Sequence, residues 1–356
     1  IVSHHQHTGV VYGMVKADGK IDALISAGTY ADFFGSILER DFAAVTPGAA
    51  AAATTVAAVS GFTYTITRGA GSWITDGLKI GNVVRITGAG IHANNINKNL
   101  LIVALTATVC TVLVLNSTVM NAEGPIATYV LTVVGKKTFA PLTGHAKDYY
   151  TIEEWYSDLS KSETFTDMRP ANMAVSLPAT GNATVSTDFI GLARTLGVAQ
   201  VLTSPTLTST PVMSAANGAI YIGGDVQAFA TAINFSISNS AANSGAVIGS
   251  NSGQDVTTAR IKVTGSLTAQ FDSTTLQSLY TGESNTTIIV VLTGDETAMS
   301  EFISFTFGRV KITSDSPDDG EKTITRTYAF TAEYNSTGGA TTAYEQAILA
   351  INDSAA

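Results

Sequence analysis

Two stretches near opposite ends of the chain share one pattern of apolar and polar positions. GKIDALISAGTYADFF begins at Gly19, and GSLTAQFDSTTLQSLY begins at Gly265. In both, an alternation with period two, typical of a strand, changes to the spacing of a helix with one buried face. Aligning the two glycines pairs Ile21 with Leu267. The pattern predicts the same strand–helix unit twice.

The two predicted helices carry apolar stripes at matching places, which marks one buried face on each. Ser26 or Thr29 is the predicted N-cap of the first helix, because a short hydroxyl side chain satisfies free N–H groups there. Thr274 or Thr275 has the same predicted role in the second helix. The repeat-helix residues, expected at equivalent positions, are Thr29, Tyr30, Phe33, Phe34, Thr275, Leu276, Leu279 and Tyr280.

A second pair of similar segments follows in the same order. FTDMRPANMAVSLPATGNATVSTDF starts at Phe165, and FTFGRVKITSDSPDDGEKTITRTYAF starts at Phe305. Each has an arginine soon after Phe-Thr, then a glycine turn, then an alternating strand, which predicts a β-hairpin. The matched positions are Arg169 with Arg309, Gly181 with Gly320, and Val185 with Ile324. The dipeptide Asp319-Gly320 favours a type I′ turn.

The spacing of the two units differs between the copies and predicts an inserted domain. From the first glycine to the hairpin arginine is 150 positions in the first copy and 44 in the second, a difference of 106. Residues 47–145 contain six Lys and Arg against two Asp and Glu, a net charge of +4, whereas the remainder has 13 against 26, or −13. Five strand-like runs, FTYTITR, NVVRITGA, LLIVALTA, VCTVLVL and TYVLTVVGK, indicate a small all-β domain, either a barrel or a sandwich.

The most apolar run, LLIVALTATVCTVLVL, contains the one cysteine of the chain, Cys110. Its 16 residues are fewer than the roughly 20 needed to span a membrane, and its Val, Ile and Thr favour strands. We predict two buried strands with a turn near residues 106–108, and no transmembrane segment. A single cysteine permits no disulfide within the chain.

Composition narrows the classes of protein. Of 356 residues only 13% are charged, so Ser, Thr, Asn and Gly must cover much of the surface. This profile suits an extended β-rich protein or one that buries surface in an assembly, and it argues against a disordered chain. The net charge of −9, with no basic run, argues against tight binding to DNA phosphates.

No motif indicates catalysis, a cofactor or a metal. His4, His5 and His7 could bind a metal, but a terminal cluster of this kind is more often solvated chain. GAGSW and TGAG lack the third glycine of a dinucleotide fingerprint. SDSPDDGE is acidic, yet its spacing does not match an EF-hand and a hairpin turn explains its Asp-Gly. We expect a protein that is not an enzyme, with no catalytic, cofactor or metal site.

The order of these elements resembles a known family. GDVQAFATAINFSISNSAA, a long polar loop, RIKVTGSLTAQFDSTTLQSLY and FGRVKITSDSPDDGEKTITRTYAFTAEY are similar to tail tube proteins of long-tailed, siphovirus-like bacteriophages. The resemblance covers residues 205–340 well, residues 10–42 and 148–193 more weakly, and the insertion not at all. It implies a mainly β fold: two tube-type β-sandwiches, each with one flanking helix, plus the inserted all-β domain.

The resemblance sets the expected domain boundaries. The first tube domain is discontinuous and comprises residues 1–46 and 146–196. The inserted β domain comprises residues 47–145, and the second tube domain comprises residues 197–356. Because the insertion is positively charged and has strands of its own, we expect it outside the tube as an autonomous decoration.

The resemblance also implies a function. The chain would be a structural subunit of the tail tube, in stacked rings whose inner barrel is the channel for genome ejection. Expected partners are other copies of the chain, tail proteins such as the tape measure and tail terminator, and double-stranded DNA as a transient, non-specific passenger. The expected location is the virion tail, after assembly in the host cytoplasm. Many Thr, Ser and Asn residues and an acidic excess suit a lumen through which DNA slides.

The duplication implies the symmetry of a ring. Rings in this family have six tube domains, so three duplicated chains would form a homotrimer that is a pseudo-hexamer. Only 18 residues precede Gly19, too few to match the strand AINFSIS and the loop that precede Gly265. We expect either that the matching strand is missing from this chain or that the first copy is incomplete.

A long loop of the second copy is a candidate contact between rings. SAANSGAVIGSNSGQDVTT is too polar and glycine-rich to pack alone, so we expect it to be mobile in the free subunit and to order against the next ring. The inter-ring positions are Ser240, Gly245, Gly249, Gly253 and Thr258.

A secreted or surface β-repeat adhesin, or a surface-layer protein, is the alternative. Four glycosylation sequons, at Asn116, Asn182, Asn285 and Asn335, are compatible with secretion, although Thr-rich chains contain such triplets by chance. A helix within each repeat is not expected of an adhesin, which should also be monomeric.

Overall fold

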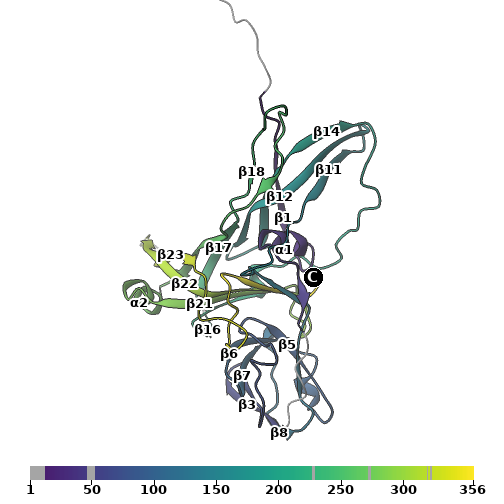
Figure 1. Cartoon of the computed structure of the whole chain (residues 1–356). Helices are drawn as coiled ribbons and strands as arrows, with labels where there is room; N and C mark the ends of the chain where they lie inside the picture. The colour runs from purple at the N-terminus through teal and green to yellow at the C-terminus, as the bar shows by residue number, and fades with distance from the viewer. Residues whose placement is uncertain (1–12, 46–52, 227–228, 272–273, 319, 321–322) are drawn as a thin grey trace, which may run out of the picture.

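The computed structural model describes residues 13–45, 53–226, 229–271, 274–318, 320 and 323–356. The predicted mainly β fold is confirmed: the regular structure consists of a 15-stranded main sheet, a separate seven-stranded sheet and a two-stranded ribbon, with two short α-helices. Figure 1 shows the seven-stranded sheet below the main sheet, and an arm of strands that rises above it.

The central path of the main sheet runs through both predicted copies without a break. Its order is β1-β13-β12-β17-β20-β23-β22-β21-β15-β16, and the neighbours are antiparallel. These strands are β1 (Ala17–Leu24), β12 (Lys161–Leu177), β13 (Thr184–Gly191), β15 (Gly218–Ile222), β16 (Asp225–Val226), β17 (Ala230–Ser238), β20 (Lys262–Gln270), β21 (Asn285–Thr293), β22 (Phe302–Asp318) and β23 (Thr325–Ala332). The pairing of β12 with β17 joins the two copies into one sheet.

Shorter strands extend the ends of the two longest strands. The first part of β12 pairs with β11 (Tyr150–Tyr156) on one side and β14 (Ala193–Gly197) on the other, which makes the arm. The first part of β22 pairs with β21 and with β24 (Ala350–Asp353), and β24 continues to β10 (Lys136–Phe139) and β2 (Ala43–Ala44). Both predicted hairpins, β12–β13 and β22–β23, are therefore present.

The strands of the two copies share registers as well as order. Gly19 lies opposite Phe189, and Gly265 lies opposite Phe330. The β12–β13 pair bulges between Pro170 and Asn172, and the β22–β23 pair bulges between Ile312 and Ser314, immediately after the partner of each phenylalanine. The pairs β11–β12 and β21–β22 also share a bulge, with Ile152 opposite Phe165 and Ile288 opposite Phe307.

The predicted alignment of the hairpins is wrong by two residues. Arg169 pairs with Ile190, which follows Phe189, and the residue that pairs with Thr331 after Phe330 is Lys311, not Arg309. A shift by two leaves the alternation of an antiparallel strand unchanged, so the pattern alone cannot fix it. The predicted turn dipeptide includes Asp319, which lies outside the described residues.

The two helices lie at the predicted places, and Thr274 is the N-cap of the second as predicted, whereas neither Ser26 nor Thr29 is the N-cap of the first. Helix α1 (Ala31–Ile37) has Tyr30 at its N-cap, and α2 (Thr275–Thr281) has Thr274 there, and neither cap side chain bonds a backbone N–H. The hydroxyl of Thr29 lies instead 2.6 Å from Ser26 Oγ and 2.7 Å from Thr208 Oγ1. Tertiary packing therefore stabilises these helices, each only about two turns long.

The helix stripes are buried to different extents. In α1, Phe34 is fully buried with Ile37, whereas Phe33 is half-buried against Tyr150 and Phe189. In α2 only Leu276 is buried, and Leu279 is half-buried. The main core joins both copies, since it includes α1, β12, β13, β17, β20, β22, β23 and β24.

The inserted segment forms the seven-stranded sheet, in the order β8-β3-β4-β7-β6-β5-β9. Its strands are β3 (Thr54–Ser60), β4 (Thr63–Thr67), β5 (Val83–Thr87), β6 (Leu100–Leu105), β7 (Val109–Val114), β8 (Glu123–Ile126) and β9 (Val130–Val133). All five predicted strands are present, and the run around Cys110 forms β6 and β7 as predicted. Two strands were not predicted: β3, whose pattern is Ala-rich, and β8, which contains Gly-Pro.

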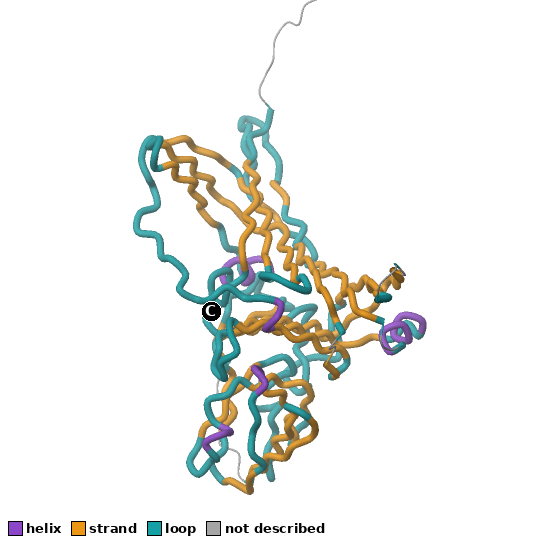
Figure 2. Tube along the Cα trace, turned by 180° about the vertical axis from the view of Figure 1, so that it is seen from behind, coloured by secondary structure: helices purple, strands orange, loops and turns teal. Residues whose placement is uncertain are grey.

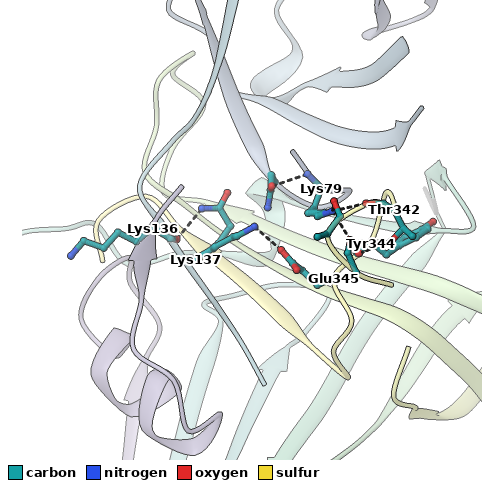
Figure 3. A network of polar contacts seen from close by, with 10 residues as sticks. Lys79, Lys136, Lys137, Thr342, Tyr344 and Glu345 are labelled. Carbon is teal, nitrogen blue, oxygen red and sulfur yellow. Dashed lines mark hydrogen bonds and ion pairs between the residues drawn. The ribbon is translucent and has the colours of Figure 1, made fainter. Parts of the chain in front are cut away.

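The insertion shares its core with the second copy, so the expectation of an autonomous domain is wrong in this respect. Its buried side chains form one cluster with Ile289, Val291 and Phe302 on the outer face of β21 and β22. A buried lysine adds a polar contact: Lys79 Nζ donates to the carbonyls of Gly339 (2.8 Å) and Thr342 (2.5 Å), as Figure 3 shows.

Further polar contacts fix the base of the insertion. Lys137 Nζ pairs with Glu345 at 2.6 Å, and the Asn352 side chain donates to the carbonyls of Val134 (2.9 Å) and Lys136 (3.0 Å) (Figure 3). Burial lowers the pKa of Lys79, because removal from water disfavours the charged ammonium group, and the negative charge of Glu345 opposes the shift. The contacts indicate a docked position for the insertion.

Candidate functional site: a polar sheet face with open edges

The main sheet has one apolar face and one polar face. Strand β13 and much of β17, β20, β23 and residues 172–177 of β12 alternate between buried and more exposed positions, and their buried residues, such as Val175, Phe235 and Leu267, enter the core. The opposite face carries Asp18, Lys20, Asp22, Asn172, Ala174, Ser176, Thr184, Ser186, Asp188, Asn234, Ser236, Ser238, Lys262, Thr264, Ser266, Thr268, Thr325, Thr327, Ala329 and Thr331. Hydroxyl and amide groups dominate this polar face.

Neighbouring side chains on the polar face bond one another across strands. Ser176 Oγ donates to Asn234 Oδ1 at 2.5 Å, and the Thr268 and Thr327 hydroxyls lie 3.0 Å apart. Such pairs stabilise the sheet, and they leave fewer groups free to hold a passing ligand.

Charges on the polar face nearly balance. The residues named above for this face include three aspartates and two lysines, and Lys20 pairs with Asp22 at 3.0 Å. Hydrogen bonds from Ser186 and Lys20 lower the pKa of Asp22, so it stays ionised at neutral pH. The acidic excess expected on a lumen face is therefore small on these strands.

The sheet has an open edge at each end of its polar part. Among the described residues, β1 pairs only with β13, and residues 312–318 of β22 pair only with β23. The corresponding part of β12, residues 172–177, pairs with β17, which in turn pairs with β20, the counterpart of β1. Unpaired edges of this length invite another strand.

The predicted inter-ring loop is partly structured within the single chain. It forms the ribbon of β18 (Ala242–Asn243) and β19 (Val256–Thr257), and Val256 is fully buried. The buried Arg169 supports the loop, because its Nη1 donates to the Val256 carbonyl at 2.9 Å. At the tip, Val247 and Ile248 are exposed.

The predicted inter-ring positions are spread along this loop. Ser240 and Thr258 lie at its base, where Thr258 Oγ1 donates to Glu39 at 2.5 Å. Gly245 and Gly249 adopt positive φ angles in its outer part, and Gly253 lies against the Asn243 side chain. The bond to Glu39 places Thr258 near the C-terminal end of α1, whereas α2 lies at the margin of the molecule (Figure 1).

Features of other functional classes carry little weight. Within the described part of the chain, no three His, Cys, Asp or Glu side chains form a metal-binding group. The histidines His4, His5 and His7 lie outside that part. Cys110 is buried, and burial raises the pKa of its thiol, which makes it unreactive. None of the helices in the described ranges could span a membrane.

A family comparison decides between the tube and the adhesin. The model of a family described as phage tail tube protein matches residues 50–332. The chain belongs to the phage tail tube protein family. The tail tube protein is thus a structural component of the virion tail. A search of curated proteins finds no match.

The matched range includes the inserted domain of the tail tube protein, where the sequence analysis found no resemblance. The open edges and the exposure of α2 were not predicted either. A strand pattern shows which face is buried but not which strand lies beside it, so no sequence signal could have found the edges.

Proposed function

We propose that three tail tube protein chains form a ring, and that the rings stack into the tube through which the genome leaves the capsid. Each chain supplies two copies of one unit, so the ring has approximate sixfold symmetry. The observation that carries the proposal is the continuous sheet, polar on one face and open at both edges. Closing three such sheets into one barrel pairs every edge and turns the polar faces toward a lumen.

The shared registers support two copies of one unit. Four strand pairs of the first copy recur in the second. The pairs β1–β13, β11–β12, β12–β13 and β12–β14 correspond to β20–β23, β21–β22, β22–β23 and β22–β24. Two bulges recur at matching places. Because a bulge inserts one residue at a defined point, its recurrence by chance in two unrelated hairpins is improbable.

The seam between two chains has a position for one further strand. Strand directions alternate along the sheet, so β1 and β22 run the same way, and a strand between them would run opposite to both, as β17 does between β12 and β20. The described residues supply no strand for this position. We propose that each seam contains one, which completes eight strands per chain, the seven of the path from β1 to β22 plus one.

The polar face fits the passage of DNA. Several of its hydroxyls and amides are paired with one another, as in Ser176 with Asn234 and Thr268 with Thr327, and its few charges nearly balance. A lumen that held phosphates with many Lys and Arg would slow a sliding duplex, because each ion pair with a phosphate adds affinity. The proposed partners are other copies of the chain and the tail proteins at the two ends of the tube, with assembly in the host cytoplasm.

Native mass spectrometry and electron microscopy of the purified protein test the proposal. We expect trimers, and rings or tubes with six lobes around a central channel. A ring of six chains would be consistent with a tube but would contradict the proposal that three duplicated chains complete one ring. A monomer that forms neither rings nor tubes would reject the proposed function.

The loop from 240 to 258 is proposed to contact the next ring. Deleting residues 246–250 removes the exposed tip but leaves the ribbon of β18 and β19 and the bonds of Ser244 Oγ with the backbone N–H groups of Gln254 and Asp255. We expect rings that no longer stack into tubes, seen in electron micrographs as single rings. Tubes of normal length from this variant would exclude the loop tip from the contact.

A further inference from the structure

Helix α1 packs under outer strands that belong to the other copy of the unit. The Phe34 ring meets the Phe305 ring of β22 edge-on, with centroids 5.6 Å apart. Just before the helix, the Gly28 N–H lies 3.0 and 2.9 Å from the two carboxylate oxygens of Asp353 in β24. Phe34 and Asp353 are almost fully buried. The first copy therefore uses its helix to fill the space beneath β22 and β24.

Helix α2 lacks such a cover within the described chain. Aligning Gly19 with Gly265 places Tyr280 at the position of Phe34 and Phe271 at the position of Ile25. Ile25 is fully buried, whereas Phe271 is 39% and Tyr280 is 38% exposed. An aromatic pair exposed at positions that are core in the other copy marks a surface that is incomplete in the single chain.

The arm is the counterpart of the strands that cover α1. Phe305 and Ile351 pair across β22 and β24, and the matching pair across β12 and β14 is Glu163 with Leu196. Leu196 is 69% exposed, and Val198, just beyond β14, is 72% exposed. No helix in the described chain lies over these residues as α1 lies over Phe305. Figures 1 and 2, from opposite sides, show α2 and the arm at separate margins of the molecule.

We propose that α2 of one chain packs against the arm of a neighbouring copy, on the face of β12 and β14 that carries Glu163 and Leu196. The contact repeats between chains the one that α1 makes with β22 and β24 inside the chain. It rests on the proposed ring, since in a ring the second copy of each chain lies beside the first copy of the next.

The side chains suit a contact that forms only on assembly. Inside the chain the contact is apolar, with Ile37 and Leu349 fully buried. The corresponding residues are Glu283 on the α2 side and Arg194 on the arm, which are exposed and of opposite charge. Within the chain Glu283 pairs with Lys311 at 3.3 Å and Arg194 with Glu163 at 2.6 Å, so both ion pairs lie at the rim of the proposed contact. Opposite charges at the rim of an apolar centre steer association and keep the free subunit soluble.

Cross-linking of paired cysteines tests the contact. The variant Tyr280→Cys with Leu196→Cys places one thiol on each surface, while the native Cys110 is buried. The control variant combines Tyr280→Cys with Val59→Cys, an exposed position in β3 of the insertion. Assembled protein is treated with a short bismaleimide and analysed on denaturing gels. We expect covalent dimers and trimers from the first variant and only monomers from the control.

The outcomes separate the contact from the ring. If electron micrographs show rings or tubes but the Tyr280–Leu196 variant gives no covalent oligomer, the contact is wrong and the proposed function stands. If no ring forms under any condition, the proposed function fails, and the contact with it.

A substitution provides a second readout. Leu196→Asp should raise the protein concentration needed for assembly by roughly tenfold or more, because it replaces the exposed apolar side chain of the contact with a second carboxylate opposite Glu163. The matched control, Leu207→Asp, changes a residue that is 85% exposed in the loop after the arm and should leave assembly unchanged. Equal assembly of Leu196→Asp and the control would overturn the contact.

Discussion

The two helices occupy matching places in the sheet, yet one lies in the core and the other at the surface. Helix α1 buries five residues, including Phe34 and Ile37, beneath strands of the second copy, whereas α2 buries Leu276 alone. The backbone arrangement is the same in both copies. The apolar character of the helix side chains therefore depends on whether strands of the same chain cover the helix. A contact made during folding can be fully apolar, while a contact made on assembly must first tolerate water.

Removal of the insertion is expected to have the largest effect. It covers Ile289, Val291 and Phe302, whereas the corresponding face of the arm carries Glu153 in place of Ile289 and a half-buried Trp155 in place of Val291. Each exposed apolar side chain costs roughly 1.5–3 kcal/mol, enough in sum to unfold the second copy.

The insertion can be deleted without disturbing the strands on either side of it. Since β2 and β10 are antiparallel neighbours, a short turn can replace residues 46–134. We expect insoluble protein, or a soluble form that binds a hydrophobic dye and lacks a cooperative thermal transition. A soluble, cooperative deletion variant that still forms tubes would show that the insertion is an autonomous decoration after all.

Matched substitutions in the two helices give the next largest difference. Phe34→Ala should cost about 3–5 kcal/mol of the free energy of unfolding, because it opens a cavity between α1 and Phe305. Tyr280→Ala should cost less than about 1 kcal/mol in the free subunit, because the ring is partly solvated. Urea denaturation of the unassembled variants measures both. Similar losses would mean that α2 is covered within the chain and that the comparison fails.

Asp353 gives the second copy a pH dependence that the first copy lacks at the corresponding residue, Val198. Burial, with a smaller effect of Glu301, raises the pKa of Asp353 to about 6, although backbone N–H groups of Gly28 and Ala355 oppose the shift. The folded state then binds a proton more tightly than the unfolded state. The stabilisation is full below about pH 4 and is lost as the pH rises through about 6.

The expected size of this loss is up to about 3 kcal/mol. Asp353→Asn should remove it, so the variant's free energy of unfolding should change less between about pH 4 and about pH 7 than that of the natural chain. Urea denaturation at both pH values measures the difference. Equal pH dependence in the two proteins would show that Asp353 does not titrate in this range.

The two aligned glycines should respond differently to a methyl group. A Cβ at Gly265 would lie 2.5 Å from the Asn234 carbonyl and 2.5 Å from the Phe330 ring, whereas a Cβ at Gly19 would meet nothing within 4 Å. Gly265→Ala should cost about 1–3 kcal/mol in the free subunit, and Gly19→Ala should change its stability by less than about 0.5 kcal/mol. Thermal unfolding of the free subunits checks both values.

Assembly of the Gly19→Ala variant sharpens this result. Gly265 is crowded partly because β17 lies beside it, and the proposed seam strand would lie in the same way beside Gly19. Weaker ring formation by a stable Gly19→Ala subunit would support the seam strand. Unchanged ring formation would contradict a seam strand packed closely against Gly19 at the edge of β1.

Much of the fold follows from short-range pattern in the sequence. The alternation around Gly19 and Gly265, the helix stripes and the strands around Cys110 were predicted, because period and turn chemistry are local. The hairpin alignment failed by two residues, since period two is blind to such a shift. Strand β3 was missed because alanines give little contrast between its faces.

The candidate site depended on information that no local pattern contains. The polar residues of β20 and β23 could be expected to share a face, but not that β17 joins the two copies or that β1 is left at an edge. The cover of Phe34 by Phe305 links residues 271 positions apart (305 − 34). Contacts of that range are set by tertiary packing.

The recurring bulges have a consequence for how the diameter of the tube lumen is maintained during evolution. Each bulge bends its strand immediately after the partner of Phe189 or Phe330, and it does so through the backbone, whatever side chains surround it. In the proposed ring, the diameter of the lumen would then be set by these backbone bulges, which occur in both copies of each chain. The lining residues could drift from one lineage to another, and the diameter would be inherited unchanged.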